Sequence, residues 1–160
     1  MTLSRKIADA LDESTRVIAP PYTTEVHDGP DRVRLEIAAL DSVGVALDAL
    51  EYAALDRRDW TPQALNAWGE RLSARLTYLL EPVGILESDA GAGLVLLRSR
   101  EPSRRGDVRG YYEIWLGRDG VCRVERVTFD EVKRLRSPAR CHFTREVVER
   151  LADDIAASSR

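Results

Sequence analysis

The residues best suited to binding chemistry lie in one basic segment and in the aromatic run that follows it. The basic segment holds five arginines: Arg98, Arg100, Arg104, Arg105 and Arg109. The run that follows contains Tyr111, Glu113 and Trp115. Guanidinium groups bind phosphate oxygens, and aromatic rings stack on nucleobases. These eight side chains are therefore the candidate contacts for a ligand or a partner.

Charge is divided unevenly along the chain. Residues 98–140 hold 12 Lys and Arg against 7 Asp and Glu, whereas residues 1–80 hold 9 against 13. The whole chain has a net charge of −3, and 22 of its 24 basic residues are Arg. Acidic residues also interrupt the basic segment, at Glu101 and Asp107. We therefore expect most of these arginines to be solvated or ion-paired, with nucleic-acid binding as the less favoured alternative.

Glu113 is the carboxylate in the most unusual setting. Alternation along a strand places Tyr111, Glu113 and Trp115 on one face of that strand. A glutamate between aromatic rings on an open sheet face is suited to contact a ligand. The commoner arrangement is a glutamate paired with an arginine on the neighbouring strand, and we expect that arrangement here.

The sequence gives little support for a metal-binding site or for a catalytic nucleophile. The chain has two cysteines and two histidines: Cys122, Cys141, His27 and His142. Cys141 and His142 are adjacent, whereas structural zinc sites space their ligands by two to four residues. No Gly-x-Ser-x-Gly elbow is present. The sequence therefore predicts no metal site, no cofactor and no disulfide framework. It leaves enzymatic activity undecided but disfavoured, and Cys122 is expected to be a core residue.

Three helices are expected to position these groups. Apolar residues at helical spacing predict a helix over residues 3–18, which Pro20 and Pro21 end. Thr61 is a good N-cap residue with Pro62 at the first helical position, and a leucine stripe continues to Leu80. A third helix is expected over residues 145–157, with Thr144 as its N-cap.

The strands fall into two groups. Composition predicts a strand at residues 22–27. Alternation predicts strands at residues 33–39 and 43–52, although residues 46–51 also have helical character. Four more are expected at residues 83–87, 94–97, 111–116 and 121–129, the last two joined by an Asp119-Gly120 hairpin turn. Residues 101–109 are expected to form a long polar connection. The order α-βββ-α-ββββ-α with short turns predicts an α+β fold with an antiparallel sheet and three helices packed on it.

Size and composition limit the class of protein. The chain has 160 residues, of which 44% are hydrophobic and 32% are charged, which fits one folded domain over residues 1–160. No apolar run is long enough for a secretory signal or a membrane-spanning helix. We therefore expect a cytoplasmic protein with no membrane partner.

In element order, length and acidity, the chain resembles the small α+β chaperones of bacterial type III secretion. That resemblance implies a homodimer that binds an extended segment of a partner protein. It comes with no residue motif, and the additional strand in the second half departs from the pattern.

The expected function is accordingly a non-enzymatic protein-binding or chaperone-like module acting as a homodimer. Its expected interface is the Leu65–Leu80 stripe or an open sheet edge. The alternatives are a small anionic-ligand binder or enzyme with a pocket near Glu113 and the Arg98–Arg109 loop, and a nucleic-acid binder.

Overall fold

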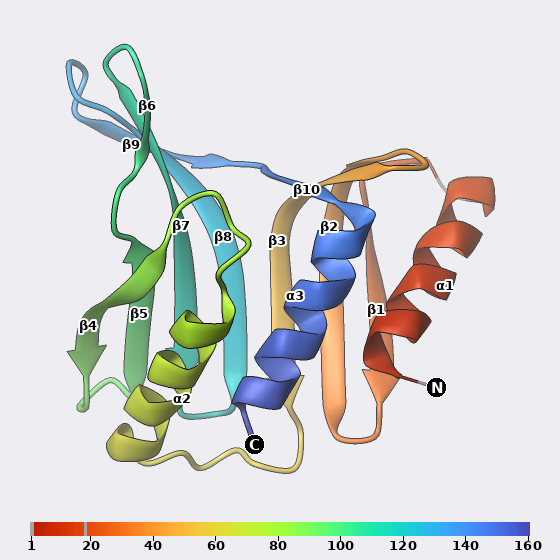
Figure 1. The fold of residues 1–160 in the computed structure, drawn as a ribbon, viewed down its shortest axis with the longest axis horizontal. Coiled ribbons are helices and arrows are strands. Elements are labelled where there is room, and N and C mark those ends of the chain that lie inside the picture. The colour runs from red at the N-terminus through yellow and green to blue at the C-terminus, as the bar shows by residue number, and fades with distance from the viewer. Residues whose placement is uncertain (1, 18) are drawn as a thin grey trace.

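The expected α+β class is confirmed in a computed structural model that describes residues 2–17 and 19–160. Its helices are α1 (Leu3–Val17), α2 (Pro62–Arg75) and α3 (Arg145–Ser158). Figure 1 shows these helices in front of one face of a long antiparallel sheet, with α3 between α1 and α2. Ile18, the expected last residue of the first helix, lies outside the described residues.

The described strands form one sheet that is larger than the sequence predicts. They are β1 (Tyr22–Asp28), β2 (Asp31–Leu40), β3 (Gly44–Ala54), β4 (Val83–Asp89), β5 (Leu94–Ser99), β6 (Ser103–Arg105), β7 (Val108–Gly117), β8 (Val121–Asp130), β9 (Leu135–Ala139) and β10 (Cys141–Thr144). The main path runs β1-β2-β3-β8-β7-β5-β4. In addition, β10 pairs with β3, β6 with β7, and β9 with β8. Among the described strands, β1 and β4 therefore end the main path.

The sheet is assembled from two similar halves. In each half a helix precedes an antiparallel meander: α1 precedes β1 to β3, and α2 precedes β4, β5, β7 and β8. The halves join where β3 pairs with β8, from Leu50 opposite Val124 to Ala53 opposite Val121. Helix α3 contacts α1, α2 and β3, so it covers the junction. Within the meanders, β1 and β2, β2 and β3, β4 and β5, and β7 and β8 are consecutive strands that pair through short turns, which antiparallel pairing allows.

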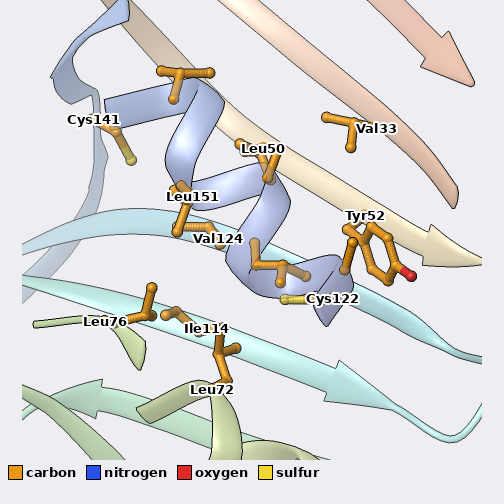
Figure 2. Close-up of a cluster of buried hydrophobic side chains, with 14 of the residues drawn as sticks. Val33, Leu50, Tyr52, Leu72, Leu76, Ile114, Cys122, Val124, Cys141 and Leu151 are labelled. Carbon is orange, nitrogen blue, oxygen red and sulfur yellow. The ribbon is translucent and has the colours of Figure 1, made fainter. Parts of the chain in front are cut away.

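The core lies between this sheet and the helices. In Figure 2, Leu50, Ile114 and Val124 project from the strands toward Leu72 of α2 and Leu151 of α3. All five side chains are almost fully buried. Removing such a side chain from water stabilises the folded chain by roughly 1.5–3 kcal/mol. Cys122 also lies in this cluster, as expected.

A second part of the core is aromatic. Trp68 of α2 stacks on Trp60 at a centroid distance of 4.7 Å and meets Tyr52 of β3 edge-on at 6.2 Å. Its indole N–H donates to Ser158 Oγ at 2.9 Å, which ties α2 to the end of α3. Burial raises the pKa of the Tyr52 hydroxyl, which hydrogen-bonds Asp31 and Ser159. The Tyr52 hydroxyl and the Trp68 indole N–H are buried polar groups with hydrogen-bond partners, and these bonds fix the orientation of the two rings.

The expected helix starts are confirmed, whereas the expected end of α2 is wrong. The Thr61 hydroxyl accepts from the Ala64 N–H at 3.1 Å, and the Thr144 hydroxyl accepts from Val147 at 3.2 Å. Helix α2 ends at Arg75, before the Glu81-Pro82 stop that the sequence suggests. The segment beyond it leaves the helical path yet still carries Leu79 into the core.

Two expectations for the strands also need revision. Residues 101–109 are not a simple connection, because they contain β6 and the start of β7. Strands β9 and β10 were not expected. Both β6 and β9 are largely exposed, so their sequences lack the alternation that marks a half-buried strand. Residues 44–54 form a strand rather than a helix, because β2, β8 and β10 all pair with them.

We expect Thr61→Ala to lower the free energy of unfolding by about 1 kcal/mol, because the first turn of α2 loses its capping acceptor. The melting temperature should fall by about 2–4 °C in a chain of this size. Urea unfolding followed by circular dichroism measures the change. The exposed Thr77, whose side chain forms no hydrogen bond with the described residues, provides the matched control. A Thr77→Ala loss equal to that of Thr61→Ala would contradict the capping role.

Candidate functional site

The candidate site lies on the face of the sheet opposite the three helices, which we term the open face. Strand alternation and register place these side chains there, among others: Arg32, Arg34, Glu36, Glu51, Glu87, Asp89, Leu94, Leu96, Arg98, Tyr111, Glu113, Trp115, Arg123 and Glu125. In the central strands β2, β3, β5, β7 and β8, most of their neighbours along the strand are buried in the core. Sequence reasoning named four of these residues as candidate contacts: Arg98, Tyr111, Glu113 and Trp115.

Toward β1 and β2, ion pairs within and between the strands cover the open face. Arg123 of β8 lies 2.9 Å from Glu36, 3.4 Å from Glu125 and 3.8 Å from Glu51. Arg32 also contacts Glu51, at 3.2 Å. Burial lowers the pKa of Arg123, but the hydrogen bond and the charges of these carboxylates outweigh it and leave the pKa raised. A planar guanidinium can serve several carboxylates at once, which explains the preference for Arg over Lys here.

Glu113 lies at the centre of β7 with its carboxylate only 1% exposed. Its Oε1 accepts from Arg98 of β5 at 3.3 Å and lies 2.7 Å from the Arg136 guanidinium of β9. The expected cross-strand arginine is thus confirmed as Arg98, which pairs opposite Glu113 and lies 4.8 Å above the Tyr111 ring. Glu113 Oε2 has no hydrogen-bond partner among the described residues. Arg136 was missed because β9 was not expected.

The remaining arginines of the basic segment do not converge on Glu113. Arg104 and Arg109 both lie 3.0 Å from Glu131, and Arg109 also lies over the Phe129 ring. These residues belong to a projection that we term the arm, formed by residues 103–110 and 128–139, at the upper left of Figure 1. Arg105 is exposed near the tip of the arm. Arg100 follows β5 and packs its guanidinium against Gly84.

A hollow of about 200 Å³ lies at the other end of the open face, beside β4. Five side chains line it: Glu87, Asp89, Leu94, Leu96 and Trp115. The register places Glu87 opposite Leu96, and Leu96 opposite Trp115. Leu86, which a β-bulge leaves unpaired in β4, is 54% exposed next to it.

Of these five residues, sequence reasoning named only Trp115. A signal for the others exists in the run Leu94-Val95-Leu96-Leu97, which is apolar on both faces of the strand. Such a strand needs cover on both faces, yet the described helices cover only one. The surplus leucines therefore line the hollow.

The charges in the hollow are not balanced within the chain. Glu87 and Asp89 form no ion pair with any described residue, and Asp89 Oδ1 accepts only from the Ala92 N–H, at 3.0 Å. Trp115 also has no arginine over its ring among the described residues. Five other rings do: those of Trp60, Tyr78, Tyr111, Tyr112 and Phe129. The hollow therefore combines an uncovered indole with two uncompensated carboxylates.

The two thiols are placed for packing. Cys122 and Cys141 are buried on β8 and β10. Burial raises the pKa of Cys141 to about 12, and it raises that of Cys122 as well. Both thiols are thus protonated near neutral pH, whereas nucleophilic cysteines need a lowered pKa. Within residues 2–17 and 19–160, no group of three or more His, Cys, Asp or Glu is arranged to hold a metal ion.

Comparison of the chain with protein-family models, with curated proteins and with solved structures gave no match. None of the described helices is long and apolar enough to cross a membrane. The resemblance to type III secretion chaperones stays a prediction.

Removing both Arg98 and Arg136 should destabilise the fold by about 1–3 kcal/mol beyond the loss of their packing, because the buried Glu113 carboxylate then has no cation. We expect Arg98→Met/Arg136→Met to cost clearly less in a chain that also carries Glu113→Gln. Urea unfolding of four proteins measures this difference in the free energy of unfolding: the parent chain, Arg98→Met/Arg136→Met, Glu113→Gln and the combination of all three substitutions. Equal losses with and without Glu113→Gln would show that the charge of Glu113 plays no part.

Native protein at pH 8 should not react with an aromatic disulfide reagent, because both thiols are buried and protonated. Both should react in 6 M guanidinium chloride, where their pKa values return to the ordinary range. Absorbance of the released thiolate counts the reactive groups. Rapid reaction of Cys141 in the folded chain would contradict its placement.

Proposed function

We propose that this chain is a non-enzymatic protein-binding module that binds an extended segment of a partner along β4 and the adjoining open face. One observation carries the proposal. The edge strand β4 lies beside a hollow, and each has an exposed leucine: Leu86 belongs to β4, and Leu94 lines the hollow.

The geometry of β4 supports strand addition. Among the described strands, β4 pairs only with β5, so its outer backbone groups face away from the sheet. Figure 1 shows no other element beside that edge. An extended segment can pair with such an edge and place alternate side chains on the open face.

The opposite edge, β1, is also contacted by a helix. Helix α1 packs against β1. The Lys6 ammonium from α1 donates to the His27 carbonyl at 3.0 Å and to Asp28 at 3.1 Å. Helix α2 likewise packs against β4, where Ser73 Oγ donates to the Val83 carbonyl at 2.7 Å. The hollow and the exposed leucines, rather than helix contacts, therefore make β4 the better candidate.

The helical alternative for the interface does not fit. The stripe from Leu65 to Leu80 was expected to serve both a core and a partner. Leu65, Trp68, Leu72, Leu76 and Leu79 are buried in the core, and only Leu80, at 99% exposed, faces outward. One exposed leucine is an ordinary surface feature.

The anionic-ligand and nucleic-acid alternatives have weaker support. Arg98 is paired with Glu113, and Arg104 and Arg109 are paired with Glu131. A guanidinium that is already neutralised has less to offer a phosphate. No observation favours either alternative over the β4 edge. The expected homodimer and the chaperone-like role stay predictions.

The proposal is tested by selection from a phage library of random linear peptides displayed against the native protein. We expect enriched peptides with strand-forming residues. Their dissociation constants, from fluorescence anisotropy, should rise about tenfold or more with Leu86→Gln/Leu94→Gln. The reason is that a bound peptide would bury about half of each leucine side chain, and glutamine does not contribute this apolar burial energy.

The matched control is Val43→Gln/Val132→Gln, which makes two exposed apolar residues polar away from β4. It should leave binding within twofold of the parent chain. Circular dichroism checks that all variants are folded. Failure to enrich any peptide, or an equal loss in both pairs of variants, would overturn the proposal.

A further inference from the structure

We propose that the hollow beside β4 is a receptor for one arginine or lysine side chain, carried by an extended segment of a basic partner protein. This inference rests on the proposed function and names the chemistry of the segment that β4 receives. The hollow is lined by Glu87, Asp89, Leu94, Leu96 and Trp115.

The lining matches each part of a long cationic side chain. The exposed carboxylates of Glu87 and Asp89 supply negative charge at the rim, next to β4. The half-buried Trp115 supplies the ring that attracts cations most strongly. Leu94 and Leu96 supply an apolar wall for the methylene stem, which Lys and Arg side chains bury readily.

The size of the hollow selects a side chain rather than a free ligand. Sites for drug-sized ligands usually enclose about 300–1,000 Å³. The hollow has about 200 Å³ and opens at the surface. Its volume therefore suits a single side chain held in place by the backbone of a bound segment.

The absence of an internal cation is informative because arginine is so abundant. The other carboxylates that we place on the open face all have arginine partners: Glu36, Glu51, Glu113 and Glu125. Tyr111, the neighbouring aromatic residue on that face, has Arg98 over its ring. Within the described part of the open face, the hollow combines an aromatic ring and carboxylates with no basic residue in its lining. Arg123 lies opposite Trp115 in the register, but its guanidinium is held by Glu36, Glu51 and Glu125. A cation from another molecule would complete the same pattern.

The charge on β4 also argues for a basic partner and against a second copy of the same edge. Two β4 strands paired together would bring the carboxylates of Glu87 and Asp89 from both copies close to one another. Like charges on paired strands destabilise the pairing. A basic segment has the opposite effect, because each cation neutralises one of these carboxylates.

The test uses the peptides selected against the native protein. We expect the tightest binders to contain a basic residue whose replacement by citrulline, a neutral isostere of arginine, weakens binding at least tenfold. Anisotropy in 50 mM salt measures this ratio. Trp115 fluorescence should change on binding, since Trp60 and Trp68 are buried and respond less.

The paired variants separate the hollow from general charge. Glu87→Gln/Asp89→Asn should bring the arginine and citrulline peptides within twofold of each other. Glu101→Gln/Asp107→Asn removes the same two charges from exposed positions outside the hollow, and it should keep the full ratio. Trp115→Leu should weaken the arginine peptide more than the citrulline peptide.

Each contrary result has a distinct meaning. Selected peptides without basic residues, or a ratio unaffected by Glu87→Gln/Asp89→Asn, would overturn the inference and leave the protein-binding proposal intact. No enrichment of any peptide would overturn both. The remaining possible occupant of the hollow is a second copy of the chain, and sedimentation velocity tests for it by measuring the oligomeric state. A parent dimer that Glu87→Gln/Asp89→Asn converts to monomers would place a second copy in the hollow and overturn the inference.

Discussion

The pairing of β3 with β8 is the contact on which the rest of the structure depends. It joins two meanders, each with its own preceding helix, into one sheet from β1 to β4. It also places Leu50 and Val124 opposite each other beneath α3, where Leu151 completes the core. Without this junction, each meander would expose one edge strand to water, with unpaired backbone groups and apolar side chains beside it.

When helices cover only one face of a sheet, the side chains of the other face must make that face compatible with water. Here arginines and glutamates on neighbouring strands pair across β2, β3 and β8, and they cover the buried Ala49 and Ala53. Each half-exposed pair contributes little to stability, about 0–1 kcal/mol. Together these ion pairs cover the small apolar residues of the open face and present a polar surface to water with few unpaired charges.

That pattern changes across β7. Glu113 is the last carboxylate of the paired region, held by Arg98 and Arg136. Beyond it the surface becomes leucine, tryptophan and unpaired carboxylate, and the sheet ends at β4. A surface that is apolar, negatively charged and bordered by free backbone groups has the requirements of strand recognition in one place. The proposed binding site therefore lies at the edge of the sheet rather than at its most buried charge.

Local chemistry in the sequence was sufficient for the helix starts, the α+β class and most strands. The reason is that Thr61-Pro62, Thr144 and the alternation in residues 33–39 act within a few residues of themselves. The same alternation predicted an arginine partner for Glu113. The sequence did not indicate β6 or β9, since exposed strands carry no apolar period. Nor did it show that Glu87 and Asp89 share a hollow with Trp115. Those residues meet only because β4, β5 and β7 pair in a particular register. Glu87 and Asp89 have no ion-pair partner among the described residues, because the nearby arginines pair with other carboxylates that are distant in the chain. Only the tertiary structure decides such long-range pairings.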